Sequence, residues 1–397
     1  MHAVDEAVTL LVAAGRKLAE KREKIGVPVH RARGLILADD VVSTLDVPPR
    51  DNSAMDGYAY RYKDAAEAGF RLKVSQRVPA GKAAEPLEKG TAARIFTGAE
   101  IPDGADTVAM QEDCRVEGCA VVLAAEMARG ANIRRKGQDV RVGDVILRRG
   151  VRLRPQELGL LASVGCSEAV VSRPLRIAMF STGDELVDAG KALQRGQIYN
   201  SNRATLAGLF SAWNMDAVDL GICPDKPEAV AAFLAKAAQD ADVVVTSGGV
   251  SVGEEDHVKD AVEKSGSLNL WKIAIKPGKP LAFGEVEGKP FIGLPGNPAS
   301  VFVTALILLR PFLLAMAGQQ GFHAPPLKQL AQFSRKAGKR QEYLRARRVA
   351  AGVEIFANQS SGMLSSACWG DGFVVQYAGQ EISEGQAVDF FPYDWLF

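Results

Sequence analysis

The sequence lacks an excess of charge of either sign. Its 397 residues include 48 Lys and Arg against 47 Asp and Glu, which leaves a formal net charge of +1 at pH 7. Chains that bind nucleic acid or an anionic membrane through their overall field carry a clear basic excess. The sequence therefore predicts neither partner, and any site for an anion has to be built locally.

Cysteine is scarce, and the few cysteines are not spaced as pairs. There are five, without a C-x-x-C motif: Cys114, Cys119, Cys166, Cys223 and Cys368. An odd number without this motif is typical neither of a disulfide framework nor of a zinc knuckle, and it fits a reducing compartment. The apolar stretch near the start of the chain is short, mixed and preceded by acidic residues, unlike a signal peptide. We therefore expect a cytoplasmic protein.

An uninterrupted membrane-spanning run is missing as well. Residues 299–318 are apolar and about long enough to cross a bilayer, but Arg310 and Pro311 interrupt them. A buried helix explains such a segment better than a membrane span. A chain of this length has room for roughly two to four domains, each with its own apolar core.

What the sequence does contain is a stretch suited to binding an anion, at residues 241–280. Residues 243–245 form a short apolar run that is typical of a strand buried on both faces of a parallel sheet. Gly248 and Gly249 follow, and glycine lets the backbone turn sharply and bring N–H groups close to a ligand. A helical pattern begins near residue 257. Strand, glycine loop and helix in this order are typical of phosphate sites in open α/β sheets.

Two lysines follow the glycine loop. Lys276 and Lys279 flank Pro277 and Gly278, and Pro280 comes next. A stiff, polyproline-like backbone repeats roughly every three residues, so it would point both ammonium groups to one side as an anion clamp. Two solvated lysines in a surface turn remain the alternative at this point.

The first part of the chain changes its pattern and then returns to it. Residues 3–21 have apolar positions at helical spacing. Residues 44–60 are rich in turn formers and oxygen donors, which predicts an ordered turn, with a functional loop as the alternative. From residue 70 to about residue 139 the periodicity is that of strands, and residues 151–173 return to mixed signals. We expect a β-rich domain at 46–141 inserted into a mixed α/β domain of residues 1–45 and 142–173.

Beyond residue 174 the pattern alternates between strands and helices as far as residue 318, which predicts a doubly wound parallel sheet. Residues 319–397 become β-rich again after a linker with two prolines. Their basic run at 335–348 is interpreted as a solvated strand edge, because the interleaved aromatics of a nucleic-acid site are scarce. The predicted fold class is a multidomain α/β protein with a central doubly wound parallel-sheet domain and flanking β-rich domains.

Polar groups gather where the predicted strands of the central domain end. Glu185 follows the first strand, Asp225 the second and Asp256 the third. Asn297 is a plausible N-cap and Pro298 the first residue of the last helix, which would direct free N–H groups into the same crevice. Helix caps alone can explain single carboxylates. Mg²⁺ with a phosphorylated ligand accounts for the whole set, because this cation takes few carboxylates and shares its other positions with phosphate oxygens and water.

Six motifs resemble one family in order along the chain. They are DNSAMDGYA (51–59), FTGAEIPDGADTV (96–108), STGDEL (181–186), SGGVSVGEED (247–256), WKIAIKPGKPLAF (271–283) and GLPGNPAS (293–300). With them the chain resembles the molybdopterin molybdenumtransferases, the molybdenum insertases related to the gephyrin E domain.

The resemblance implies a homodimer of four-part subunits that end in a small C-terminal β-barrel. The central part is similar to stand-alone molybdopterin-binding adenylyltransferases. The implied reaction takes adenylylated molybdopterin, molybdate and Mg²⁺ and releases AMP. A molybdopterin adenylyltransferase and apo-molybdoenzymes, or the chaperones of those enzymes, are the implied partners.

The resemblance also assigns roles to residues. Positions tied to nucleotide, metal or catalysis are Asp56, Thr97, Asp139, Glu185, Asp225 and Asp256, of which the last three are expected to hold Mg²⁺. Positions expected to contact the cofactor or molybdate are Gly248, Gly249, Ser251, Lys272, Lys276, Lys279, Pro295, Pro298, Arg345 and Ser361. Since Asp56 and Thr97 lie in the inserted part, the family's dimer suggests that loops of one subunit close over the crevice of the other.

The sequence departs from the family at two positions, and three other functions stay open. His257 stands where an aromatic residue is frequent, and Gln138 stands where an acid precedes the aspartate. Neither replaces a proposed ligand. The alternatives are a molybdopterin adenylyltransferase, a paralogue that handles tungstate, and a scaffold without catalysis. The first of these activities does not need the flanking β-rich domains.

Overall fold

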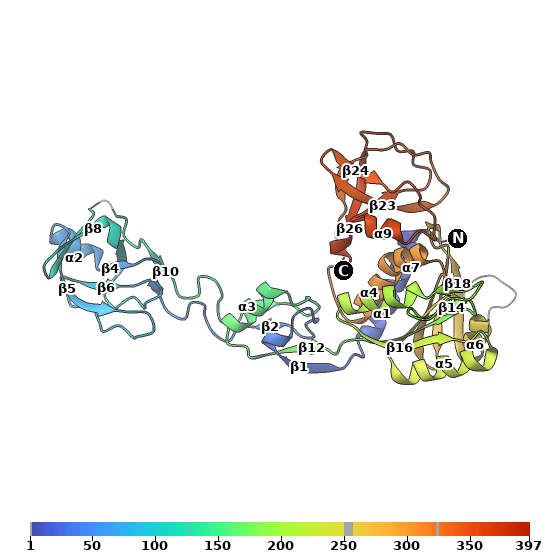
Figure 1. Cartoon of the computed structure of the whole chain (residues 1–397). Coiled ribbons are helices and arrows are strands. Elements are labelled where there is room, and N and C mark those ends of the chain that lie inside the picture. Colours follow the sequence, from blue (N-terminus) through green and yellow to red (C-terminus); the bar gives the residue numbers. More distant parts are fainter. Residues whose placement is uncertain (1, 126, 250–256, 323–324) are drawn as a thin grey trace.

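The chain folds into an elongated molecule. The structure is a computed structural model and describes residues 2–125, 127–249, 257–322 and 325–397. Figure 1 shows a β-rich unit at the far left, a small mixed unit beside it and the α/β sheet at the right, with the C-terminal strands, in red, above that sheet. The N-terminus and the C-terminus both lie at the α/β end (Figure 1).

The first helix packs against the last long helix of the α/β part. Helix α1 (Val4–Ala19) confirms the helix predicted at residues 3–21, and its apolar face contacts α8 (Arg310–Met316). The backbones come close at Gly15, where a Cβ would lie 2.6 Å from the carbonyl oxygen of Phe312. A larger residue at position 15 would push the two helices apart, so glycine is required by close packing.

The insertion leaves and returns along paired strands. β1 (Lys24–Pro28) pairs antiparallel with β12 (Glu168–Ser172). Farther out, β2 (Val41–Val42) pairs with β11 (Val145–Leu147), and β3 (Asn52–Ser53) pairs with β10 (Ile133–Arg134). The 3₁₀ turn η1 (Val29–Arg31) and helix α3 (Pro155–Ser163) contribute to a small apolar core beside this ladder. The two chain segments therefore run side by side toward the far end of the molecule.

The far end is a six-stranded sheet in the order β7-β4-β6-β5-β9-β8. Its helical residues are only α2 (Tyr62–Glu67) and the short turn η2 (Gln111–Asp113) within the described part of residues 57–123. The strands are β4 (Gly57–Tyr60), β5 (Arg71–Val78), β6 (Thr91–Ile95), β7 (Thr107–Met110), β8 (Cys114–Glu117) and β9 (Ala120–Leu123). The β-rich character predicted from the period-two pattern is confirmed.

The central sheet has the order β16-β13-β17-β21-β20-β18 and is covered by helices on both faces. Side chains of its strands alternate between two cores: Ile177 contributes to the core with α1, α4 and α8, and Ala178 to the core with α5 and α6. The elements are β13 (Arg176–Thr182), α4 (Ser201–Ala212), β16 (Asp216–Cys223), α5 (Pro227–Asp240), β17 (Val243–Ser247), α6 (His257–Ser265), β18 (Gly266–Lys272), β20 (Pro280–Val286) and β21 (Lys289–Leu294). The doubly wound arrangement is confirmed.

One strand of this sheet, β20, runs against the direction of the others. β16, β13, β17 and β21 are mutually parallel, whereas β20 pairs antiparallel with both β21 and β18. The reason is the turn at Glu287 and Gly288, whose φ angles of 47° and 76° are both positive. Two consecutive residues with positive φ form the tight turn of a β-hairpin, which leaves no length for a crossover helix. The prediction of a parallel sheet thus describes its core but misses this hairpin.

The apolar segment near residue 300 is a core helix. α7 (Pro298–Thr304), a π-helical turn η3 (Ala305–Leu309) and α8 form one continuous helix, the one described helix with the length and composition of a membrane span. Of that segment, 94% is buried inside the molecule. Pro311 lies two residues after the π-helical turn, where the proline ring and its missing N–H disturb the regular hydrogen-bond ladder. The interpretation as a buried helix is confirmed.

The C-terminal strands close into a barrel. The ladder β24-β23-β25-β26-β22 is closed because Ala331, just after β22, forms a parallel bridge with Val353 in β24. The strands are β22 (Leu327–Leu330), β23 (Gln341–Val349), β24 (Gly352–Ile355), β25 (Gly372–Gln376) and β26 (Ala387–Pro392). The short β19 (Ile275–Lys276) comes from the α/β part and pairs in parallel with β23. The barrel is therefore joined by a strand pairing to the segment that contains Lys276 and Lys279, here called the lysine segment.

Candidate active site

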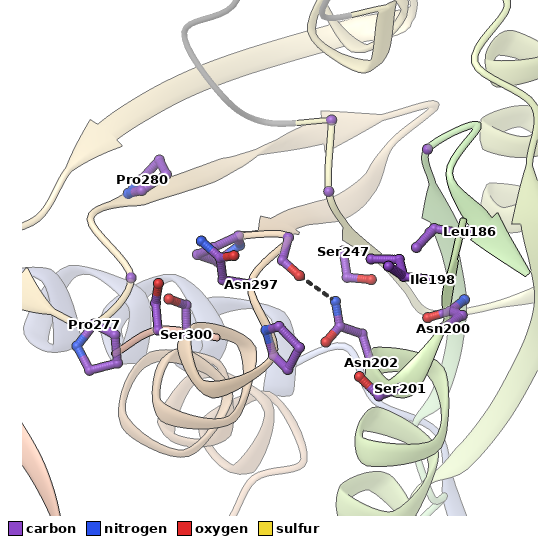
Figure 2. A pocket seen from close by; sticks show the side chains of 18 of the residues that line it. Leu186, Ile198, Asn200, Ser201, Asn202, Ser247, Pro277, Pro280, Asn297 and Ser300 are labelled. Atoms are coloured by element: carbon purple, nitrogen blue, oxygen red, sulfur yellow. Dashed lines mark hydrogen bonds between the residues drawn. The ribbon is translucent and has the colours of Figure 1, made fainter. Parts of the chain in front are cut away.

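A cavity of about 1010 Å³ lies where the carboxyl ends of the parallel strands face the barrel. Loops after β13, β16, β17 and β21 line it, together with the segment after β19 and parts of the barrel. Parallel strands end at one edge of their sheet, so these loops converge there. In Figure 2, Pro277 and Pro280 lie on one side of the cavity and Leu186 and Ile198 on the other.

Glycine is required in the loop after β17. Gly248 and Gly249 line the cavity and have φ angles of 88° and 64°. A Cβ on Gly248 would lie 2.8 Å from the carbonyl oxygen of Thr182, and one on Gly249 would lie 2.7 Å from Cγ2 of Val258. Both the backbone conformation and the available space therefore select glycine. Ser251, expected in the same loop, lies outside the described residues.

Two of the three expected metal ligands line the cavity. Glu185, which precedes the short strand β14 (Leu186–Val187), and Asp225, which follows β16, come from neighbouring loops. The backbone N–H of Asp225 donates to Oδ1 of Asp184 at 3.3 Å and so ties the two loops together. The third expected ligand, Asp256, lies outside the described residues. Among the residues that the structure describes, no three His, Cys, Asp or Glu side chains are grouped so that they could hold a metal ion. What the described part provides is a pair of carboxylates.

The lysine segment turns instead of extending. Gly278 has a φ of 99°, which no polyproline-like backbone adopts, so the predicted extended clamp is wrong in its backbone geometry. A Cβ at this position would lie 2.4 Å from Cγ2 of Thr304, so the turn is pressed against the long core helix. Lys276 and Lys279 nevertheless both line the cavity.

Lys276 is held by a carboxylate of the barrel. Its Nζ donates to Oε1 of Glu342 at 2.8 Å, and Nη2 of Arg335 donates to Oε2 of the same carboxylate at 2.6 Å. Burial acts to raise the pKa of Glu342, but the hydrogen bonds and charges of the two cations outweigh it and hold that pKa below its usual range. Glu342 is therefore ionised at neutral pH, and it forms an ion triad with Arg335 and with Lys276, which lines the cavity.

Arg345 lies behind the cavity wall. Its side chain is 1% exposed, and it donates to Oγ of Ser366 at 2.9 Å, at the start of α9 (Ser365–Trp369), and to the carbonyl oxygen of Ser360 at 3.1 Å. Ser360 and Ser361 line the cavity directly. In this single chain Arg345 therefore does not line the cavity itself but supports Ser360 and Ser361, which do.

The start of α7 forms another part of the wall. Pro295, Asn297 and Pro298 line the cavity, and α7 begins at Pro298 as expected. The side chain of Asn297 makes no capping hydrogen bond, contrary to the expectation of an N-cap contact. The N–H of Ala299 donates to the carbonyl oxygen of Ser361 at 2.9 Å, so it is not free as predicted. The barrel thus caps the helix that faces the cavity.

Besides Arg345, four expected residues among those described lie outside the cavity lining. Asp56 and Thr97 are brought together, since Oδ1 of Asp56 accepts from the backbone N–H of Thr97 at 2.7 Å and from its hydroxyl at 2.9 Å. These bonds hold the pKa of Asp56 below its usual range. This pair belongs to the β-rich sheet at the far end of the chain (Figure 1), and Asp139 lies on the returning segment. Lys272 is exposed at the end of β18.

Sequence reasoning missed several polar side chains that line the cavity, among them Asn200, Asn202 and Arg340. Asn200 and Asn202, at the start of α4, are both 8% exposed, and Nδ2 of Asn202 donates to the carbonyl oxygen of Gly296 at 2.7 Å. The capping pattern before α4 could have pointed to Asn200, whose Oδ1 accepts from the N–H of Arg203 at 3.2 Å. Arg340 belongs to the basic run interpreted as a solvated strand edge, and that interpretation is wrong for Arg340 and for the buried Arg345.

The cavity therefore combines both signs of charge. Lys276, Lys279 and Arg340 contribute cations, and Glu185 and Asp225 contribute carboxylates. Lysine and arginine bind phosphate and other oxyanions, while paired carboxylates bind a hard divalent cation. The arrangement suits an extended ligand that carries phosphate groups, next to a second anion.

Three family models match the chain in order. The MoeA N-terminal region (domain I and II) matches residues 2–165, the probable molybdopterin binding domain matches residues 178–315, and the MoeA C-terminal region (domain IV) matches residues 329–393. The second of these contains most of the cavity, and the third contains its barrel side.

Individual proteins are similar over most of the chain. The molybdopterin molybdenumtransferase of Haemophilus influenzae is 46% identical over 301 residues, which are 75% of this chain and 74% of that protein. The molybdopterin molybdenumtransferase of Nostoc sp. is 38% identical over 327 residues, 80% of this chain and 75% of that protein. The crystal structure of a molybdopterin biosynthesis moeA protein from Pyrococcus horikoshii OT3 has a TM-score of 0.82 at 28% identity, with 96% of this chain and 99% of that chain covered.

Proposed function

The chain belongs to the molybdopterin molybdenumtransferase family, and we propose that it inserts molybdate into adenylylated molybdopterin with Mg²⁺ and releases AMP. The observation that supports this reaction best is the single cavity with three cationic side chains and two carboxylates. Its volume of about 1010 Å³ is large enough for a nucleotide-linked pterin, since pockets for drug-sized ligands reach a similar size.

The donor set fits Mg²⁺. Glu185 and Asp225 are carboxylates from adjacent loops, and oxygen ligands in small number are what this cation takes from a protein when phosphate and water supply the rest. Asp256 is proposed as a third ligand from the next loop. When bound there, Mg²⁺ would offset negative charge on the pyrophosphate of the substrate.

The protein's own side chains position the reactants. Lys276 and Lys279 would hold molybdate, and the Gly248–Gly249 turn would let the backbone approach a phosphate closely. An oxygen of molybdate or of water then attacks the phosphorus on the pterin side of the pyrophosphate, the bond from that phosphorus to the bridging oxygen breaks, and AMP leaves with the bridging oxygen. No protein nucleophile is required, because alignment and charge stabilisation provide most of the rate in phosphoryl chemistry.

A second subunit would complete the site. Asp56 and Thr97 form a hydrogen-bonded pair at the opposite end of the elongated chain from the cavity (Figure 1). In a homodimer the β-rich end of one subunit can approach the cavity of the other, and we propose that Asp56, Thr97 and Asp139 act there. Arg345 and Lys272 are proposed to act on the same ligands indirectly or in the dimer. We place the reaction in the cytoplasm, with the adenylyltransferase and apo-molybdoenzymes or their chaperones as partners.

The test is AMP release by the purified chain from adenylylated molybdopterin with Mg²⁺, with and without molybdate. The account predicts release that molybdate accelerates and a product that activates an apo-molybdoenzyme. Tight binding without release would support a scaffold instead. Acceleration by tungstate but not by molybdate would identify the tungsten paralogue, and ATP-dependent adenylylation of molybdopterin would identify the adenylyltransferase.

A further inference from the structure

Backbone hydrogen bonds connect the barrel to the segment that carries Lys276 at the cavity. β19 pairs in parallel with β23, with Ile275 opposite Gln341 and Lys276 opposite Glu342. The N–H of Gln341 donates to the carbonyl oxygen of Ala274 at 2.9 Å, and Nη1 of Arg340 donates to that of Ile275 at 3.1 Å. The lysine segment thus forms an edge strand of the barrel sheet, so the two parts cannot move independently at this point.

The side chains repeat this connection. The Lys276 side chain is 40% exposed and this residue lines the cavity, whereas the Glu342 side chain is 8% exposed. Glu342 is fixed in turn by Arg335, whose Nε donates to Oε1 of Gln376 at 3.0 Å, and the amide of Gln376 donates to two carbonyl oxygens of the barrel. The ammonium group is therefore attached to a rigid chain of polar contacts that ends in the barrel core.

A lysine that binds an oxyanion benefits from such an anchor. Its side chain is long and flexible, and ordering it at the moment of binding costs free energy that a preformed contact removes. One hydrogen of the ammonium is used by Glu342, which leaves two for an oxyanion in the cavity. Because the carboxylate is shared with Arg335, the triad keeps a net positive charge toward the ligand.

We propose that Glu342 is a positioning residue for the bound oxyanion, acting through Lys276. This inference rests on the proposed function and deepens it, because it makes the C-terminal barrel part of the molybdate subsite. The barrel contributes a buried acid that holds a cation of the α/β part in its binding orientation. Substrate contact itself belongs to Lys276.

The test is a double-mutant cycle with Glu342→Gln, Lys276→Ala and the double variant. Glu342→Gln keeps the shape and one acceptor but removes the charge that holds both cations. We expect it to raise the molybdate concentration for half-maximal AMP release about tenfold while kcat changes less than about twofold. In the Lys276→Ala background the same substitution should have no further effect, because coupled residues are not additive.

A purely structural role gives a different pattern. If Glu342 only stabilised the barrel, its substitution would act equally in both backgrounds, and that result overturns the proposal. A lower half-saturating molybdate concentration in Glu342→Gln overturns it as well, because Glu342 would then compete with the anion for Lys276. The control is Glu354→Gln, which breaks an ion pair with Arg347 on the same barrel, away from the cavity, and should leave the molybdate dependence unchanged.

Molybdate binding without the pterin is measured alongside the rates. A wild-type chain that binds molybdate but releases no AMP contradicts the proposed reaction alone, whereas an unchanged molybdate affinity in folded Glu342→Gln overturns the positioning role. Should Glu342→Gln fail to fold, Arg335→Gln replaces it in the cycle. That variant frees the second oxygen of Glu342 and should again weaken molybdate binding only while Lys276 is present.

Discussion

Lys276→Ala is expected to lower kcat/KM for molybdate about 100-fold, while the affinity for adenylylated molybdopterin changes less than about threefold. The reason is location: Lys276 lines the cavity, its side chain is partly exposed, and its Nζ is held at 2.8 Å from Oε1 of Glu342. Removing it leaves the oxyanion without a fixed positive partner, whereas the much larger pterin nucleotide keeps its other contacts. The measurement is AMP release against molybdate concentration, together with equilibrium binding of the adenylylated pterin.

The matched control is Lys339→Ala. It removes an equal charge from an exposed residue next to Arg340, outside the cavity lining. Its molybdate dependence should equal that of the wild type. If Lys276→Ala weakened pterin binding and molybdate use to the same degree, the assignment of Lys276 to the oxyanion would be wrong.

Asp225→Asn is expected to raise the Mg²⁺ concentration for half-maximal rate more than about tenfold and to lower kcat about 100-fold. Asparagine keeps the size of the side chain but lacks the charge that holds a divalent cation. Glu185→Gln should have the same effect, because both carboxylates line the cavity from loops tied together through Asp184. The rate of AMP release is measured over a range of Mg²⁺ concentrations.

Glu228→Gln serves as the control for this pair. Glu228 lies in the first turn of α5, close to Asp225 in sequence, but it is exposed outside the cavity lining. An Mg²⁺ dependence that is unchanged in Asp225→Asn and Glu185→Gln would show that the cation is held elsewhere.

The central part of the fold could be predicted because its signals are local. Short apolar runs such as residues 243–245 are buried on both faces of the sheet. Positions 248 and 249 require glycine, because their φ angles are positive and neighbouring atoms leave no room for a Cβ. The carboxylates after β13 and β16 reach the cavity because parallel strands end at one edge. The hairpin at Glu287 and Gly288 was missed because the alternating pattern itself does not give strand direction.

The barrel side of the site could not be predicted from local patterns. Arg340 and Arg345 belong to one basic run, yet Arg340 lines the cavity, and Arg345 is buried behind it. Their positions depend on where β23 begins and on its pairing with β19. This pairing brings together residues far apart in the sequence, such as Lys276 and Glu342, which are 66 positions apart. A tertiary pairing of this kind leaves no periodic signal in either segment.

The inserted part shows a different limit. The motifs around Asp56 and Thr97 contributed to the family resemblance, and two hydrogen bonds join these two residues. The single chain nevertheless holds them at the end opposite the cavity (Figure 1). Their proposed action on the ligand depends on a second subunit, which neither local pattern nor the fold of one chain supplies.

The most direct test of the account is an anomalous-scattering map, recorded at the molybdenum absorption edge, of crystals soaked in molybdate. The account predicts a molybdenum peak inside the cavity, within hydrogen-bonding distance of the Lys276 ammonium group. The peak should be lost in crystals of Lys276→Ala and retained in crystals of Lys339→Ala. A peak at another place on the chain, with the cavity empty, would contradict the assignment of this cavity as the molybdate site.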